Sequence, residues 1–417
     1  MMKHLKQIEV KRDKTRNKFL LTGRRGGKTT YLCEDILSSL PECPDRGELF
    51  YIGPTNQMAS ELMWEPLEDR LDELGWKYQP RISKQRFEFS RGRKIYLIGA
   101  EKIRRIRGHK VFRLYLDELA FFEQPLDQVW KAARPTLTDL GGRVIASTTP
   151  NGKGTQAYDF FMQVLSKEDW KTFTWNTTDN PFIDPIEIEQ ARRDMDEKSF
   201  RQEYEASWES FEGLAYYNFS EATHIVPCGT LDWNLDIAAC YDFNVNPTTI
   251  LISQSLPNRV FVRKEFSNKN SSTIDTTEDM CKWLRSQLPE NAPLSVDVHG
   301  DAAGNNRHSS TGKSDYYYVE EIFKKYGINF RFKVMAKNPH PPDRVAHVNA
   351  WLKNVVGDSR IEIDPQCKDL IRDLSSQELD GRYPSDKNNL GHKADAFGYY
   401  ICWKQLVGSR HSSMIQL

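Results

Sequence analysis

The segment LLTGRRGGKTT at residues 20–30 limits the possible folds of this 417-residue chain more than any other. An apolar run leads into it and a stretch with helical periodicity follows, so the segment lies where a strand passes into a helix. In that setting small residues let backbone N–H groups surround phosphates, and the helix N-terminus adds its positive dipole end. The sequence therefore predicts a parallel α/β domain with a nucleotide site at Lys28 and Thr29.

The expected phosphate-binding loop is a run of consecutive residues. Its members are Thr22, Gly23, Arg24, Arg25, Gly26, Gly27, Lys28 and Thr29. Lys28 is expected to reach the β- and γ-phosphates of ATP, and the Thr29 hydroxyl to bind Mg²⁺. Thr22 occupies the first glycine position of the G-x-x-x-x-G-K-T pattern, so the match is imperfect, and a glycine-rich surface turn is the alternative interpretation.

A second apolar run, VFRLYL, ends in two acids, Asp117 and Glu118. Asp117 is expected to hold the hydrated Mg²⁺, and Glu118 to polarise the attacking water as a general base. The gap of about 90 residues after the loop leaves room for intervening strands, as in ATPases that carry an additional strand and a catalytic glutamate. A strand that simply ends in solvated acids is the alternative.

A third segment, RVIASTTPNGKG, predicts a buried strand that ends in hydroxyl side chains. Ser147, Thr148 and Thr149 would sense the γ-phosphate and couple hydrolysis to movement if this strand lies beside the loop. A strand-end turn without such a role is the alternative interpretation.

Arginines are candidates for stabilising the charge that develops on the γ-phosphate. Arg24 and Arg25 lie within the loop, whereas Arg104, Arg105 and Arg107 lie in a basic run before the strand with the two acids. The sequence does not distinguish between them, or between action in cis and action on a neighbouring subunit. For each of these arginines, a basic surface that contacts DNA, or contacts nothing, is an equally good interpretation.

The second half of the chain carries three acids at the ends of expected elements. Asp242 lies in its first strand, Asp301 follows a buried strand, and Asp395 begins the last helix. This order is typical of RNase H-like nucleases, whose carboxylates gather around two Mg²⁺ or Mn²⁺ ions. His392 is a further candidate ligand or proton shuttle, and Asp297 competes with Asp301 as the second acid.

Strand and helix patterns alternate over the first half, which predicts a parallel sheet with helices on both faces. Strands are expected at residues 18–22, 49–53, 94–99, 112–117, 143–148 and 171–175, with helices at 29–40, 59–74 and 126–137. A second block begins near residue 236 with three strands, two of them paired around Pro257 and Asn258, and continues with alternating helices and strands. We therefore predict domains at 1–207 and 236–417, joined by a linker at 208–235.

Composition narrows the function further. The chain contains 58 Lys and Arg residues and 58 Asp and Glu residues, so its formal net charge is zero. This balance argues against tight residence on nucleic acid, whereas local basic runs suit transient contact with a polyanion. No apolar run is long enough for a membrane span, the N-terminal segment lacks the core of a signal peptide, and the seven cysteines form no CxxC pair.

Taken in order, these segments resemble the large terminase subunit of tailed bacteriophages, the motor and nuclease of viral DNA packaging. The resemblance covers residues 15–405 and is carried by TGRRGGKTT, YIGPTNQMASELMWEPL, LYLDE, STTPNGKG, SFRQEYEASWESFEG, YDFNVNPT, GDAAG and HKADAFGY. Irregular phosphate loops are known in this family, so Thr22 does not speak against it.

The resemblance implies an ATPase domain of the additional-strand catalytic-glutamate class joined to an RNase H-like nuclease domain. It implies that Lys28, Thr29, Asp117 and Glu118 hydrolyse ATP and that Ser147–Thr149 couple hydrolysis to movement. It also implies that Asp242, Asp301 and Asp395 bind the nuclease metals. It also implies double-stranded DNA, a portal protein and a small terminase subunit as partners, a ring of five on the portal, and the host cytoplasm as the location. Whether the free chain is a monomer stays open.

Two other functions are compatible with the sequence. One is an ATP-dependent scaffold whose acidic triad is vestigial, which metal-dependent cleavage of plasmid DNA would exclude. The other is a helicase or repair ATPase fused to a nuclease, which strand unwinding would favour. The sequence does not reveal the packaging strategy or how the nuclease is restrained during translocation.

Overall fold

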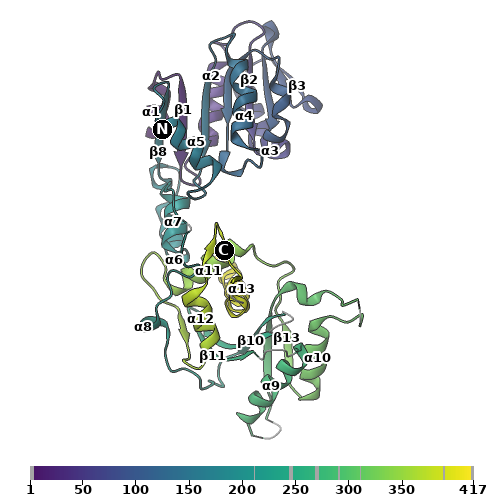
Figure 1. Cartoon of the computed structure of the whole chain (residues 1–417). Helices are drawn as coiled ribbons and strands as arrows, with labels where there is room; N and C mark the ends of the chain where they lie inside the picture. Colours follow the sequence, from purple (N-terminus) through teal and green to yellow (C-terminus); the bar gives the residue numbers. More distant parts are fainter. Residues whose placement is uncertain are drawn as a thin grey trace. The chain divides into compact units, whose positions relative to one another are not determined.

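The structure is a computed structural model that describes residues 4–210, 212–243, 248–267, 272–289, 292–309, 311–387 and 390–414, with side chains up to residue 406. It divides into two compact units, one formed by Met1–Glu189 with Lys198–Ser210, the other by Gln190–Glu197 with Phe211–Leu417 (Figure 1). The predicted domain limits and the linker at 208–235 stay a prediction. Part of the YDFNVNPT segment, residues 244–247, lies outside the described residues.

The described part of the first unit contains an eight-stranded sheet. Its order is β3 (Gln79–Arg81), β4 (Arg86–Glu88), β5 (Lys94–Gly99), β2 (Glu48–Gly53), β6 (Val111–Leu116), β7 (Arg143–Thr148), β1 (Asn17–Thr22) and β8 (Trp170–Trp175). The six strands from β5 to β8 in this order run parallel, whereas β3 and β4 pair antiparallel. Strand β7 separates β1 from β6, which confirms the additional strand expected from the sequence.

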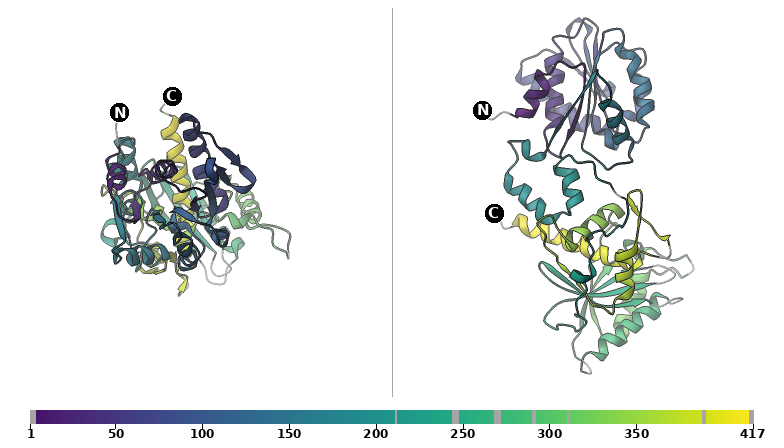
Figure 2. Two further views of the ribbon diagram at one scale, coloured as in Figure 1. Left: turned by 90° about the horizontal axis from the view of Figure 1, so that it is seen from above. Right: turned by 60° about the vertical axis from the view of Figure 1, so that its left-hand side comes forward.

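Helices cover both faces of this sheet (Figure 2). The helices of this half of the chain are α1 (Leu5–Arg12), α2 (Lys28–Ser39), α3 (Asn56–Glu73), α4 (Leu126–Ala133), α5 (Gln156–Leu165), α6 (Pro185–Asp194) and α7 (Glu197–Tyr204). Short 3₁₀ turns lie at η1 (Ile82–Lys84), η2 (Ser90–Gly92), η3 (Ala100–Ile106), η4 (Leu119–Phe121), η5 (Arg134–Leu137) and η6 (Thr177–Asp179). The expected helix at 126–137 is thus α4 followed by η5, because Pro135 has no N–H for an α-helical bond.

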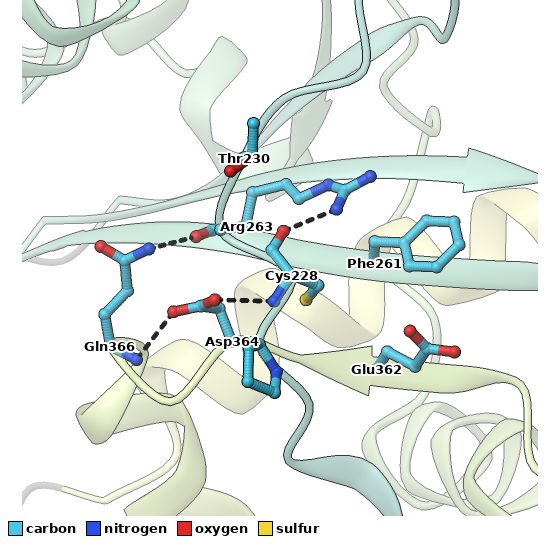
Figure 3. Close-up of a pocket in the computed structure, with 9 residues that line it drawn as sticks. Cys228, Thr230, Phe261, Arg263, Glu362, Asp364 and Gln366 are labelled. Carbon is cyan, nitrogen blue, oxygen red and sulfur yellow. Dashed lines mark hydrogen bonds between the residues drawn. The ribbon is translucent and has the colours of Figure 1, made fainter.

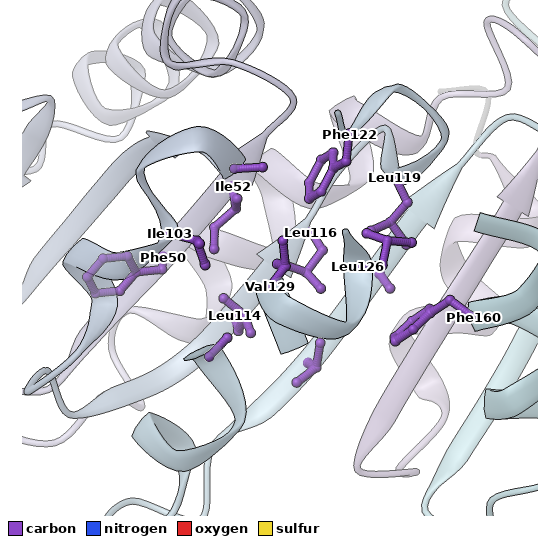
Figure 4. Close-up of a cluster of buried hydrophobic side chains, with 14 of the residues drawn as sticks. Phe50, Ile52, Ile103, Leu114, Leu116, Leu119, Phe122, Leu126, Val129 and Phe160 are labelled. Atoms are coloured by element: carbon purple, nitrogen blue, oxygen red, sulfur yellow. The ribbon is translucent and has the colours of Figure 1, made fainter. Parts of the chain in front are cut away.

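Alternation along the strands builds the two cores. Phe50 and Ile52 of β2 point into a cluster that includes residues of α4 and α5, shown in Figure 4, whereas Leu49 and Tyr51 point into the cluster formed with α2 and α3. Because β2 is buried on both faces, its sequence is a continuous apolar run rather than an alternating one. This packing fixes the strand ends from which the functional loops emerge.

The second unit, over its described residues, contains a six-stranded mixed sheet. Its order is β13 (Asn329–Phe332), β12 (Ser295–Gly300), β9 (Ile237–Asp242), β10 (Thr249–Leu256), β11 (Arg259–Ser267) and β14 (Ile361–Ile363). The pairing of β10 with β11 is antiparallel, as the Pro-Asn turn predicts, and β12 runs parallel to β9. A separate hairpin pairs β15 (Leu379–Asp380) with β16 (Tyr383–Pro384).

Two helical layers enclose this sheet. The helices are α8 (Glu221–His224), α9 (Thr273–Ser286), α10 (Asp315–Lys325), α11 (Pro341–Leu352), α12 (Lys368–Ser376) and α13 (His392–Met414), with a short turn η7 (Ala302–Asn305). Helices α11, α12 and α13 share one core with the sheet, and α9 and α10 share the other. Within the described residues, no helix combines the length and apolar character that crossing a bilayer requires.

Candidate functional site

The loop, the acids and the hydroxyls predicted from the sequence meet at one edge of the first sheet. Strands β1, β7 and β6 are parallel neighbours, so their carboxyl ends lie side by side. The loop follows β1, the two acids follow β6, and the hydroxyls end β7. This is the crevice outside the carboxyl ends of the strands, where open α/β sheets bind ligands.

Lys28 is the centre of this site. Its Nζ lies 2.8 Å from Oε1 of Glu118 and 3.2 Å from Oγ1 of Thr149. The lysine is only 7 % exposed, so its ammonium group depends on these two partners. Residues from three separate strand ends therefore converge on one cation.

Glu118 has an unusual backbone and an unusual environment. Its φ of 57° places it in the left-handed region, which is costly for a residue with a side chain. Burial raises the pKa of the Glu118 carboxyl, and Asp117 raises it further, whereas Lys28 opposes the shift. Among the described residues nothing hydrogen-bonds Oε2 of Glu118, which is buried. A strained, buried carboxylate with one oxygen unused is a candidate general base.

Asp117 accepts hydrogen bonds from three hydroxyl groups. Its Oδ2 accepts from the Tyr51 hydroxyl at 2.8 Å and from the Thr29 hydroxyl at 3.3 Å, and its Oδ1 accepts from Ser147 Oγ at 2.6 Å. Burial and the adjacent Asp117 raise the pKa of Tyr51, so this phenol stays a donor. Thr29 and Asp117 thus form a pair of oxygen ligands that fits Mg²⁺ accompanying a nucleotide.

Five side chains donate hydrogen bonds to carbonyl groups of the loop, and these bonds fix the direction in which the carbonyl groups point. The donors are Trp175 Nε1 to Gly26 O at 2.7 Å, Asn180 Nδ2 to Arg25 O at 2.7 Å, Thr177 Oγ1 to Arg24 O at 2.7 Å, His4 Nε2 to Gly26 O at 2.9 Å, and Gln7 Nε2 to Gly27 O at 2.8 Å. Because the carbonyls face these donors, and Lys28 and Thr29 open the first turn of α2, the free amide groups there are available to an anion. No pattern in the sequence indicated any of the five donors.

The irregular start of the motif also has a physical explanation. A Cβ at Gly23 would lie 2.5 Å from both Thr177 Oγ1 and Tyr204 O, so glycine is required at this position. Thr22 is completely buried, and its hydroxyl donates to the carbonyl of Gly23. Arg25 is exposed, and its φ of 60° lets the loop curve through the left-handed region. The glycine that the loop needs therefore stands one residue later than the pattern places it.

The other candidate arginines fall into two groups. Arg24 Nε pairs with Glu203 Oε2 of α7 at 2.7 Å, and the Arg24 amide donates to the Glu203 carbonyl. Arg104, Arg105 and Arg107 are exposed on and just after η3, at the carboxyl end of β5. Their strand is separated from β1 by β2, β6 and β7, so they lie along the same sheet edge as the loop but not beside it.

The hydroxyl segment connects the strands around the acids. Thr148 Oγ1 accepts from the backbone N–H of Ala120, which follows Glu118 by two residues. Ser147 contacts Asp117, and Thr149 contacts Lys28. Each of the three hydroxyls is thus bonded to the nucleotide site or to the turn that follows its acids.

In the second unit, the carboxyl ends of β9 and β12 bring Asp242 and Asp301 together. These strands are parallel neighbours, and the Asp301 amide donates to the carbonyl of Tyr241 at 3.2 Å. Asp301 Oδ1 accepts from Asn338 Nδ2 at 2.6 Å, while Asn338 Oδ1 accepts from the amide of Ala302. Asn338 therefore clamps the Asp301 side chain to its own backbone turn.

Helix α13 places the third acid, Asp395, within electrostatic range of Asp242. Burial, with repulsion from Asp242, raises the pKa of Asp395 to about 6, although Arg344 opposes this shift. Arg344 Nη2 lies 2.5 Å from Asp395 Oδ1. His392 Nδ1 lies 3.2 Å from Asp242 Oδ2, and this hydrogen bond raises the pKa of His392.

The alternative acid, Asp297, is bound elsewhere. It accepts from Arg331 Nε and from Lys333 Nζ, both at 2.6 Å, within the body of the sheet. These two cations outweigh its burial and lower its pKa. Asp297 is thus a structural ion pair, and Asp301 is the acid at the strand end.

The oxygen donors of Asp242, Asp301 and Asp395 are of the kind that Mg²⁺ and Mn²⁺ prefer, and the repulsion between Asp242 and Asp395 is what a cation would relieve. Even so, no three His, Cys, Asp or Glu side chains of the described residues are assembled closely enough to form a metal site. Asn338 and Arg344 hold two of the carboxylates instead. No motif in the sequence indicated either residue.

A separate hollow of about 640 Å³ lies in the second unit, lined by residues 227–230 with parts of β11 and β14 (Figure 3). Its charged groups are engaged within the protein. Arg263 Nη1 donates to the carbonyl of Cys228 at 2.6 Å, and Asp364 Oδ2 accepts from the amide of Cys228 at 2.8 Å. None of the predicted site residues lines it.

The two sheets with their strand-end sites define a two-domain protein, a P-loop ATPase fold followed by an RNase H-like fold. Residues 19–224 match the family model described as terminase large subunit, T4likevirus-type, N-terminal. The first half of the chain is thus similar to the N-terminal part of the large terminase subunits of bacteriophages.

Individual relatives agree with this. The large terminase subunit of Escherichia phage T5 is 26 % identical over 183 residues, which is 43 % of this chain and 41 % of that protein. The match therefore spans about two fifths of that relative's length. The large terminase of a thermophilic bacteriophage has the same fold, with a TM-score of 0.59 at 17 % identity, over 95 % of this chain and 97 % of that one. A further structure of that thermophilic phage protein, in complex with ATP-gamma-S, gives 0.58 at 18 % identity over 95 % and 97 %.

Proposed function

We propose that this chain hydrolyses ATP to move double-stranded viral DNA into procapsids and cuts the DNA concatemer with a second, metal-dependent site. The observation that carries the first half is the contact of Lys28 with both Glu118 and Thr149 at the carboxyl edge of the sheet. It joins a phosphate ligand, a candidate base and a candidate sensor within hydrogen-bond distance.

In the proposed ATPase cycle, the loop amides and Lys28 bind the phosphates. Thr29 and Asp117 would hold the Mg²⁺ that accompanies ATP, which neutralises charge on the β- and γ-phosphates. The γ-phosphate competes with Glu118 for the Lys28 ammonium, and the released carboxylate orients and deprotonates the attacking water. Loss of the γ-phosphate then removes a partner of Thr149, which passes the change to β7.

In the proposed nuclease site, Asp242, Asp301 and Asp395 would hold Mg²⁺ or Mn²⁺, which supplies an activated water and stabilises the leaving 3′ oxygen. Asn338 orients the Asp301 carboxylate, and His392 lies where it can move a proton at Asp242. Contact with the DNA backbone requires no base recognition, which suits a motor that handles any sequence. The portal protein, the small terminase subunit and a ring of five copies are partners proposed from the family.

Plasmid cleavage tests the nuclease half. The full chain with Mn²⁺ should nick or linearise supercoiled plasmid, and Asp242→Asn should lower the rate at least ~100-fold, since it removes a metal ligand. Asp236→Asn is a matched control, because Asp236 precedes the same strand and its side chain is 80 % exposed. Equal cleavage by wild type and Asp242→Asn would refute the nuclease assignment.

Procapsid filling tests the motor half. With ATP, the wild type should package DNA into procapsids, where the DNA resists added nuclease. Lys28→Ala should leave the DNA sensitive to the nuclease. Strand unwinding by the chain alone, without such protection, would instead support a helicase or repair ATPase.

A further inference from the structure

Helix α11 places a buried arginine against a carboxylate of the proposed nuclease site. Arg344 is 4 % exposed, and its Nη2 lies 2.5 Å from Oδ1 of Asp395. Arg344 is buried in this salt bridge, whereas the Asp395 side chain is 25 % exposed. The pair adds little net stability, because removing the guanidinium from water is expensive. Its presence beside a functional carboxylate therefore calls for another explanation.

Helix α13 is built to receive this arginine. A Cβ at Gly398 would lie 2.6 Å from Cγ and 2.7 Å from Cδ of Arg344, so only glycine leaves room for the stem. A glycine inside a helix is less favourable than alanine. The guanidinium also lies 4.9 Å from the centre of the Tyr399 ring. Asp395, Gly398 and Tyr399 thus form one recess for one guanidinium.

The recess holds the cation beside the acidic end of the sheet. Asp395 is close enough to Asp242 for the two carboxylates to repel each other, and Arg344 is in direct contact with one of them. An oxygen that a metal ion would use is therefore already bonded to a cation of the protein. Any divalent ion that binds Asp395 has to compete with that cation.

We propose that Arg344 is a built-in counter-cation which a divalent metal ion must displace or share, so that Arg344 sets the metal concentration at which the nuclease site becomes competent. This inference rests on the proposed nuclease function. It assigns Arg344 as a positioning residue that acts through Asp395. It also provides a restraint on cutting, because the site stays neutralised until metal outcompetes the arginine.

Mn²⁺ binding to the full chain, measured by electron paramagnetic resonance, tests the proposal. The relevant binding event is the one that Asp242→Asn abolishes. Arg344→Gln should bind Mn²⁺ at least ~10-fold more tightly, and should reach half-maximal plasmid cleavage at a correspondingly lower Mn²⁺ concentration. Arg344→Lys keeps a cation and should stay near the wild-type affinity. Arg331→Gln, which breaks a different Arg–Asp pair in the same unit, should change nothing.

Unchanged or weaker Mn²⁺ binding by a folded Arg344→Gln variant would overturn the proposal. If that variant does not fold, Gly398→Ala takes its place, because the added methyl group pushes the Arg344 stem from its recess and should also tighten Mn²⁺ binding. A folded Gly398→Ala variant with wild-type affinity would then overturn it. Absence of any binding that depends on Asp242 would overturn the proposed nuclease itself, which is a distinguishable result.

Discussion

Lys28 Nζ and Glu118 Oε1 lie 2.8 Å apart, which joins the candidate phosphate ligand directly to the candidate base. The pair connects the end of β1 to the end of β6, although the two residues are 90 positions apart in the chain. Binding of a γ-phosphate to Lys28 therefore bears directly on the charge and position of Glu118.

Glu118→Gln should bind ATP and hydrolyse it ~10²–10⁴-fold more slowly, because the amide cannot accept a proton from water. Steady-state phosphate release together with fluorescent-nucleotide binding measures both effects. Glu123→Gln is the matched control, since Glu123 is exposed in the same loop region. Unchanged turnover in Glu118→Gln would remove Glu118 from the role of base.

Trp175→Phe should raise the KM for ATP by up to ~10-fold with a smaller effect on kcat. The substitution keeps the aromatic core but removes the hydrogen bond that orients the Gly26 carbonyl, worth ~1 kcal/mol. Trp170→Phe changes the same residue type at the other end of β8, where the ring packs against Trp130 and Phe160. Equal KM values in both variants would contradict the idea that outward-held carbonyls prepare the loop.

Asn338→Ala should weaken Mn²⁺ binding and slow plasmid cleavage by ~10–100-fold, the usual range for residues that orient a metal ligand. Its amide donates to Asp301 Oδ1 alongside the backbone N–H of Ala303, and so helps to fix this carboxylate to the turn after β12. Asn305→Ala, in the same turn, removes only a bond to the Ala302 carbonyl and serves as control. A drop in thermal stability without any change in metal binding would show that Asn338 is merely structural.

The second unit should lose stability as the pH falls below about 6.5, and His299 should cause part of this loss. Burial lowers the pKa of His299 to about 3, so the folded chain keeps it neutral while the unfolded chain protonates it near 6.5. Above pH 6.5 His299 is neutral in both the folded and the unfolded chain and costs no stability. Below pH 6.5 the unfolded chain gains a proton that the folded chain excludes, so the free energy of unfolding falls by about 2 kcal/mol on reaching pH 5.

His299→Phe should therefore unfold with a flatter pH dependence than the wild type, as measured by denaturant melts between pH 7.5 and 5. The phenyl ring suits the site, because His299 packs edge-on against Tyr400 and Trp403. His340→Phe changes an exposed histidine whose ring packs on Tyr383, and serves as the control. Parallel pH profiles for His299→Phe and the wild type would contradict the assignment.

Features encoded within a short segment could be predicted from the sequence. The loop, the acids after β6 and the hydroxyls of β7 each follow an apolar run, so a local pattern marked them and parallel topology brought them together. The choice between Asp297 and Asp301 could not be made, because it depends on Arg331 and Lys333, which lie more than thirty positions away from Asp297.

Contacts between distant segments left no such pattern. His4, Gln7 and Trp175 hold loop carbonyls from 20 to 149 positions away, and Arg344 reaches Asp395 across 51 positions. The helices expected from the sequence did not include α1, which the basic N-terminal segment forms. The edge strand β3 and its neighbour β4 were also missed, since each has only three residues and β3 contains Pro80.

Helix α7 contains one of the points at which the chain passes between the two compact units. Its first residue, Glu197, groups with the second unit, whereas Glu203 and Tyr204 near its end border the loop at Arg24 and Gly23. A displacement of Arg24 by a bound nucleotide would thus act on α7 within two helical turns of the boundary between the units. In the proposed motor, a change in the length of α7 would therefore change the movement that ATP hydrolysis produces, without altering the residues of either proposed site.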